Sequence, residues 1–174
     1  MQLLIRPLTL ADTDLLFHFE QQNRAYFETY IESRGEAFYR LSSVYDHICE
    51  LLALHQKGQH VPMLITDAEG QLLGRVNISQ IDTVSASGSL GYRIAEQHTG
   101  KGVASRAVKY ALEIAREYGL VTLNAMVSTT NMASQTVLER NGFNLCGKKF
   151  NVAHVAGKAM TVFVIATHYL AFEL

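Results

Sequence analysis

The chain has 174 residues, of which 48% are hydrophobic, and its formal net charge is −1 at pH 7. This length suits one well-packed domain better than two, so we expect a single domain over residues 1–174. The sequence has no basic run and no cluster of Lys and Arg interleaved with aromatics, which argues against nucleic acid as a direct partner.

Targeting, membrane and metal motifs are also missing. Met1 is followed by an amphiphilic segment rather than a basic region and an apolar core, and no apolar run approaches the length of a membrane span. We therefore expect a cytoplasmic protein with no membrane partner. Cys49 and Cys146 lie far apart without metal-ligand spacing, which favours reduced structural thiols. Because the histidines are scattered as well, we expect no metal.

The first part of the chain predicts one strand and two helices. Residues 2–6 alternate between apolar and polar side chains, which is typical of a strand, and Pro7 ends it. Thr9 is a suitable N-cap for a first helix whose apolar stripe includes Leu15, Leu16 and Phe19. A second helix is expected over residues 36–57, with Phe38, Leu41, Val44, Tyr45, Ile48 and Leu52 on its core-facing side.

Two carboxylates stand between these helices. Glu28 and Glu32 are four residues apart, so on a helix they would share one face. Such a pair either attracts a cationic amine or forms an ordinary solvated acidic face, and the residues alone leave both readings open.

The remainder predicts a mixed sheet. Short connections make strands 61–66, 72–81 and 88–95 an antiparallel meander. A strongly amphipathic helix then runs from Val103 to Gly119 and leads to strand 121–127, so its flanking strands should pair in parallel through a right-handed crossover. A short helix over 131–140 and strands over 143–150 and 158–169 follow. The expected fold class is α/β, a mixed antiparallel and parallel sheet flanked by helices.

One loop precedes the amphipathic helix. Its two glycines allow close approach of a ligand, and the helix directs the positive end of its dipole at the same place. Neither G-x-x-x-x-G-K-[ST] nor G-x-G-x-x-G occurs here, so on spacing alone the segment is either an anion site or an ordinary tight turn. The candidate anion-binding residues are Gln97, His98, Thr99, Gly100, Lys101, Gly102, Val103 and Ala104.

Four motifs in a fixed order resemble those of the GCN5-related N-acetyltransferases. They are Gln-x-x-Gly-x-Gly at 97–102, the helix and strand that follow it, Asn131-x-x-Ser134, and Asn-Gly-Phe at 141–143. The pattern is most similar to the RimJ/RimL-like branch, which acetylates the N-termini of ribosomal proteins. It is dense over residues 88–150 and looser over the N-terminal arm. The resemblance implies acetyl-CoA as co-substrate, with its pyrophosphate on the backbone N–H groups of residues 97–102.

The resemblance also implies roles for single residues. A backbone N–H near Ile94 would polarise the thioester carbonyl, because the strand splays there in family members. Asn131 would contact the pantetheine arm and Ser134 would protonate the leaving thiolate, although both residues equally suit a helix start. Many relatives place a Tyr where this chain has Leu138, which favours Ser134 as the acid, or no dedicated acid.

The usual general base is missing. Family members often carry a Glu two residues before the Gly-Tyr of the strand, where this chain has Ser89. Tyr92, Glu28, Glu32 and His154 remain as candidates acting through water, with His154 in a predicted turn. An α-amine of pKa about 7.7–8.0 is about one-tenth unprotonated at neutral pH, whereas for a lysine amine the fraction is about one in two thousand. A site poor in carboxylates therefore suits an α-amine.

The sequence thus predicts an N-acetyltransferase that moves the acetyl group of acetyl-CoA directly to an amine, favouring a protein or peptide N-terminus, such as that of a ribosomal protein. The candidate acceptor-binding residues are Glu28, Glu32 and Tyr92. The alternatives are transfer to a small amine such as a polyamine or amino sugar, a non-catalytic acyl-CoA sensor, and a structural interaction domain. The chain is either a monomer or a homodimer, with an edge strand within residues 158–169 available for pairing.

Overall fold

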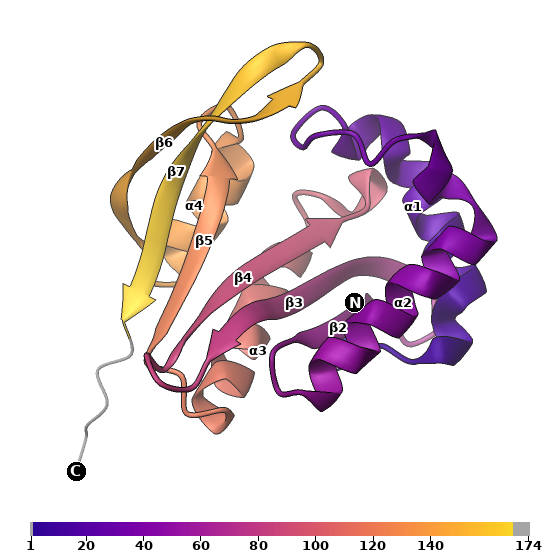
Figure 1. Cartoon of the computed structure of the whole chain (residues 1–174), viewed down its shortest axis with the longest axis horizontal. Helices are drawn as coiled ribbons and strands as arrows, with labels where there is room; N and C mark the ends of the chain where they lie inside the picture. Colours follow the sequence, from indigo (N-terminus) through magenta and orange to yellow (C-terminus); the bar gives the residue numbers. More distant parts are fainter. Residues whose placement is uncertain (1, 169–174) are drawn as a thin grey trace.

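The computed structural model describes residues 2–168 of the chain. In this part, seven strands form one sheet in the order β1-β2-β3-β4-β5-β7-β6 (Figure 1). The strands are β1 (Leu4–Pro7), β2 (Val61–Thr66), β3 (Leu72–Asp82), β4 (Ser87–Ile94), β5 (Thr122–Ser128), β6 (Asn144–Val155) and β7 (Lys158–His168). The α-helices are α1 (Thr13–Phe27), α2 (Leu41–Gln56), α3 (Val103–Glu117) and α4 (Met132–Arg140). The predicted α/β fold with a mixed sheet is confirmed.

Only one neighbouring pair of strands in the described sheet is parallel. β4 and β5, which α3 connects, pair over Ser87, Gly88 and Ser89 and no further along β4. Figure 1 shows the two strands diverging beyond this point. The sheet therefore opens between β4 and β5, because β4 continues along β3 while β5 continues along β7.

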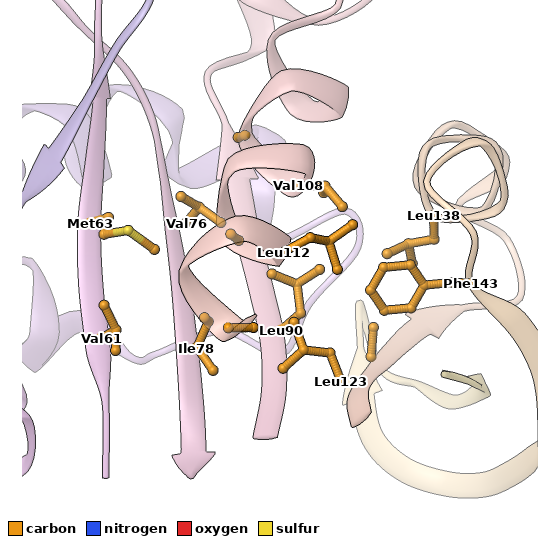
Figure 2. Close-up of a cluster of buried hydrophobic side chains, with 14 of the residues drawn as sticks. Val61, Met63, Val76, Ile78, Leu90, Val108, Leu112, Leu123, Leu138 and Phe143 are labelled. Atoms are coloured by element: carbon orange, nitrogen blue, oxygen red, sulfur yellow. The ribbon is translucent and has the colours of Figure 1, made fainter. Parts of the chain in front are cut away.

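The two faces of the sheet are covered by different helices. On β2, Val61, Met63 and Ile65 belong to the core that packs against α3, whereas Leu64 belongs to the core of α1 and α2. This division follows from the alternation of side chains along a strand. Figure 2 shows Met63, Val76 and Leu90 on the same side of the sheet as Val108 and Leu112 of α3.

The second helix differs from its prediction at its start. Residues Glu36–Tyr39 form a separate 3-10 turn, and Arg40 is extended, with φ −116° and ψ 143°, so that α2 begins at Leu41. Its buried side consists of Val44, Ile48 and Leu51. The predicted apolar side was therefore wrong at Leu41 and Tyr45, which are 45% and 44% exposed because that side of α2 faces away from α1 and the sheet.

Three further expectations are corrected. α1 ends at Phe27, so Glu28 and Glu32 follow the helix and share no helix face. His154 lies in β6 rather than in a turn, and its backbone N–H donates to Glu32 Oε1 at 3.3 Å. Strand β7 is internal because it inserts between β5 and β6, so β6 is the sheet edge. The predicted end of the last strand, Tyr169, lies outside the described residues.

No helix within residues 2–168 has the length and apolar character needed to cross a membrane.

Candidate active site

A cavity of about 410 Å³ lies where β4 departs from β5, and we call it the loop cavity. The end of α1, the end of β4, the loop that follows β4, and the first residues of α3 and α4 form its walls. The predicted site residues that line it are Tyr92, Ile94, His98, Thr99, Gly100, Gly102, Val103, Ala104, Asn131 and Ser134. The predicted residues Gln97 and Lys101 belong to the same loop but do not line the cavity.

The two loop glycines have left-handed backbones. Gly100 and Gly102 have φ of +70° and +78°, and a Cβ on either would meet no protein atom within 4 Å. The conformation, rather than crowding by the protein, therefore requires glycine here. Gly102 is the N-cap of α3, and its carbonyl accepts from Arg106 N. The first N–H groups of α3 consequently lack intrahelical acceptors at the edge of the loop cavity and suit an anion.

His98 adds unused hydrogen-bonding capacity to this wall. Both of its ring nitrogens are buried without a hydrogen-bond partner among the described residues. Burial and the charge of Lys101 lower the pKa of His98, so its ring is neutral at pH 7 and can donate one N–H. Arg140, in the last turn of α4, also lines the cavity. These donors fit a diphosphate.

A pair of hydroxyl groups lies deeper in the site. Tyr92 Oη on β4 and Ser134 Oγ on α4 are 2.7 Å apart. Burial raises the pKa of Tyr92 to about 12, so the phenol remains protonated at neutral pH and is a poor general base. Asn131 Oδ1 accepts from Ser134 N at 3.0 Å, so Asn131 caps α4 while also lining the loop cavity. Asn131 therefore fixes the start of the helix that carries Ser134.

The opening of the sheet exposes backbone donors on β4. Ala95 N donates to Leu73 O of β3 at 2.9 Å. Because N–H directions alternate along a strand, the N–H of Ile94 points away from β3, toward the side that β5 has left. This is the position at which the sequence resemblance places the donor to the thioester carbonyl.

A second cavity, of about 390 Å³, is lined by residues of α2, β3, β4, β5 and α4 and of the segment after α1, and we call it the arginine cavity. It shares Ile31, Tyr92, Arg93 and Ser134 with the loop cavity, so the two meet at the hydroxyl pair. Its basic lining residues are Arg34, His47, His60, Arg75 and Arg93.

One buried carboxylate organises the arginines. Glu20 of α1 has no exposed surface and accepts from Arg75 Nη1 at 2.8 Å and from Arg93 Nη1 at 3.2 Å. Burial opposes ionisation of Glu20, but the positive charges of Arg75 and Arg93 prevail and hold its pKa below the ordinary value. Sequence reasoning missed this group, although Glu20 follows Leu16 of the predicted apolar stripe by four residues.

The predicted carboxylates lie elsewhere. Glu28 accepts from Ser33 Oγ at 2.6 Å and from Arg24 Nε at 3.1 Å, and neither Glu28 nor Glu32 lines either cavity. No Asp or Glu is among the lining residues of the two cavities. The described part of the chain also contains no group of three or more His, Cys, Asp or Glu that could hold a metal ion.

A sheet that opens between two parallel strands, with cavities that share lining residues at the opening, can bring two substrates together. Residues 2–144 match the model of the acetyltransferase (GNAT) domain family, and the chain belongs to this family. It is an N-acetyltransferase of the GNAT type, as the sequence resemblance predicted.

Three similar proteins illustrate the relationship. A probable N-acetyltransferase, YjcK, of Bacillus subtilis is 27% identical over 143 residues, covering 80% of this chain and 79% of that protein. Spermidine N(1)-acetyltransferase of Escherichia coli is 25% identical, covering 96% of this chain and 88% of that protein. The crystal structure of ribosomal-protein-S5-alanine acetyltransferase from Vibrio fischeri superposes with a TM-score of 0.93 at 20% identity, covering 100% of this chain and 97% of that one.

Proposed function

We propose that the protein transfers the acetyl group of acetyl-CoA directly to the α-amine at the N-terminus of a protein or peptide. The observation that carries this proposal is that no Asp or Glu lines either cavity at the hydroxyl pair. A polyamine would bring several positive charges to a site that offers no lining carboxylate. An α-amine is partly unprotonated at neutral pH and needs no strong base.

The loop cavity suits the co-substrate. Backbone N–H groups at the start of α3, the neutral His98 ring and Arg140 would hold the diphosphate, and the N–H of Ile94 would polarise the acetyl carbonyl. Acetyl-CoA supplies the acetyl thioester. The acceptor amine would reach it from the arginine cavity, through the opening between β4 and β5.

The hydroxyl pair suits proton transfer between the two substrates. When the amine forms the new C–N bond and the C–S bond breaks, one proton must leave nitrogen and one must reach sulfur. Ser134 Oγ and Tyr92 Oη, 2.7 Å apart, can pass a proton along without a net change in their own protonation. This relay avoids the need for an acidic serine, whose hydroxyl is otherwise a weak proton donor.

The test is an acceptor panel supplied with acetyl-CoA, with coenzyme A release and the mass of each acceptor as readouts. We expect peptides with a free N-terminus to gain one acetyl group, and the same peptides with a blocked N-terminus to gain none. Spermidine and spermine form the second arm, included because the likeness to a spermidine acetyltransferase spans 96% of this chain. Acetylation of polyamines alone would overturn the proposal, and binding of acetyl-CoA without transfer to any amine would indicate a sensor.

A further inference from the structure

The arginine cavity contains more positive charge than its own carboxylate neutralises. Arg75 and Arg93 share Glu20, while Arg34 makes no hydrogen bond or ion pair within residues 2–168. The guanidinium of Arg34 instead lies 4.3 Å from the centre of the Phe38 ring. Burial, together with the charges of Arg93 and Arg75, lowers the pKa of Arg34 to about 10, so it remains charged at neutral pH. An anion in the cavity would relieve this repulsion.

Two histidines line the same cavity, and each has a ring nitrogen without a hydrogen-bond partner among the described residues. The Nε2 atoms of His47 and His60 are buried without hydrogen-bond partners among the described residues. Burial and the charges of Arg75 and Arg34 lower the pKa of His47 to about 4, and burial and Arg75 lower that of His60. Both rings are therefore neutral, and each can present an N–H to an acceptor atom. Leaving such groups unpaired inside a protein is costly, so their arrangement indicates a ligand with oxygen acceptors.

The position of the arginine cavity indicates that the anionic group belongs to the acceptor. The arginine cavity shares Tyr92, Arg93 and Ser134 with the loop cavity, so its occupant lies next to the reacting amine. Its volume of about 390 Å³ is near the lower end of the roughly 300–1,000 Å³ typical of small-molecule sites, which suits the first residue or two of an acceptor. A carboxylate matches the paired N–H groups of an arginine and is the anionic group that peptides and amino acids carry.

We propose that the arginine cavity binds a carboxylate of the acceptor, so that the enzyme selects amines with an acidic group close to the reacting nitrogen. This inference rests on the proposed transfer to an α-amine and specifies its substrate class. The carboxylate comes either from an Asp or Glu side chain near the N-terminus of a peptide or from the free α-carboxylate of an amino acid. In both cases the carboxylate would pair with Arg34, whose charge no carboxylate neutralises within residues 2–168.

The experiment compares kcat/KM for acceptors that differ only in one charge. One arm uses peptides with Glu or Gln at the second position, and the other uses free amino acids and their amides. We expect the acidic member to be preferred roughly tenfold or more in at least one arm, because hydrogen bonds to a charged group are stronger than neutral ones. The arm that shows the preference identifies the source of the carboxylate. Equal kcat/KM within both pairs would overturn the proposal.

A variant pair tests the residue assignment. Arg34→Gln should bring the ratio of kcat/KM between the acidic and the neutral acceptor close to one, whatever its effect on the absolute rates, and thermal melts should confirm folding. The matched control is Arg40→Gln, which removes an exposed charge six residues further along the chain and outside both cavities. This variant should keep the preference for the acidic acceptor. A preference that survives Arg34→Gln would contradict the role of this cavity.

A binding measurement separates this inference from the proposed function. The acetylated Glu peptide cannot react, so calorimetric titration of this product and of its Gln counterpart reports on the cavity without turnover. Tighter binding of the acidic peptide, lost in Arg34→Gln, would support the carboxylate site even if the transfer assay failed. An N-acetylated amino acid and its amide form a second pair, and equal binding within both pairs would count against the site even if both free peptides were acetylated.

Discussion

At the scale of single residues, the site depends on two hydroxyl groups from distant parts of the chain. Tyr92 and Ser134 are 42 positions apart and meet at 2.7 Å between the two cavities. The sequence resemblance assigns the acid role to Ser134 alone, whereas the structure places a protonated phenol beside it. In the proposed reaction the two hydroxyls form one proton path, so each is expected to affect the rate.

We expect Ser134→Ala to lower kcat roughly tenfold to a hundredfold. This loss is smaller than the largest effects of removing a general acid or base, because the hydroxyl of Tyr92 remains in the site. Affinity for acetyl-CoA, measured by titration calorimetry, should change by less than about threefold, because the proton path acts after binding. Tyr92→Phe, which removes the partner hydroxyl and keeps the ring, should lower kcat in the same way. Unchanged kinetics in Ser134→Ala would reduce this serine to a residue of the helix start.

At the scale of elements, the loop between β4 and α3 depends on its backbone conformation. Gly100 and Gly102 have positive φ, and no protein side chain crowds them. The loop can therefore bring its backbone N–H groups to a ligand only while these two positions keep left-handed conformations, which β-branched residues rarely adopt.

We expect Gly100→Val to abolish measurable binding of acetyl-CoA, because the branched side chain opposes φ of +70° and occupies the wall of the loop cavity. The matched control is Gly157→Val, at the turn between β6 and β7, where φ is +75° and a Cβ also meets nothing within 4 Å. Both variants should lose similar stability in thermal melts, whereas only Gly100→Val should lose the upward shift of the melting temperature on adding acetyl-CoA. Normal turnover by Gly100→Val would contradict the assignment of the loop.

At the scale of the whole molecule, one buried carboxylate joins α1 to the two central strands. Glu20 accepts from Arg75 of β3 and from Arg93 of β4, and the charge of Arg34 also acts on it. These ion pairs hold α1 against the sheet through Arg75 and Arg93, which line the arginine cavity. Glu20 therefore contributes both to the stability of the fold and to the net charge around the arginine cavity.

We expect Glu20→Gln to lower the free energy of unfolding by about 3 kcal/mol at pH 7, because it leaves two largely buried guanidinium groups without their carboxylate. The pKa of Glu20 is lowered in the folded state, so its contribution is present above the pKa of the unfolded chain and is lost as the pH falls toward the folded value. Urea unfolding curves of the wild-type and variant proteins should therefore converge on acidification. Glu36→Gln, at an exposed partner of Arg24, is the control and should change little.

Local order along the chain was determined by the sequence itself. The periodic apolar residues of α3, the positive-φ glycines before it, and the Asn131 cap three residues before Ser134 all depend on neighbours within about one helical turn. Such short-range preferences can be predicted from the sequence without a structure. They predicted the strand order in the chain, the parallel crossover and the position of the candidate cofactor loop.

The acceptor side was decided only by the tertiary structure. Glu20 lies 55 residues from Arg75 and 73 from Arg93, and no local pattern predicts that α1 crosses β3 and β4 at this point. The insertion of β7 inside the sheet likewise depends on which strand edge remains free. Contacts of this kind depend on strand register and helix packing, where a shift of one residue turns every side chain to the opposite face. The sequence therefore determined the loop proposed to hold the co-substrate, whereas the folded sheet decided which charges line the cavity proposed for the acceptor.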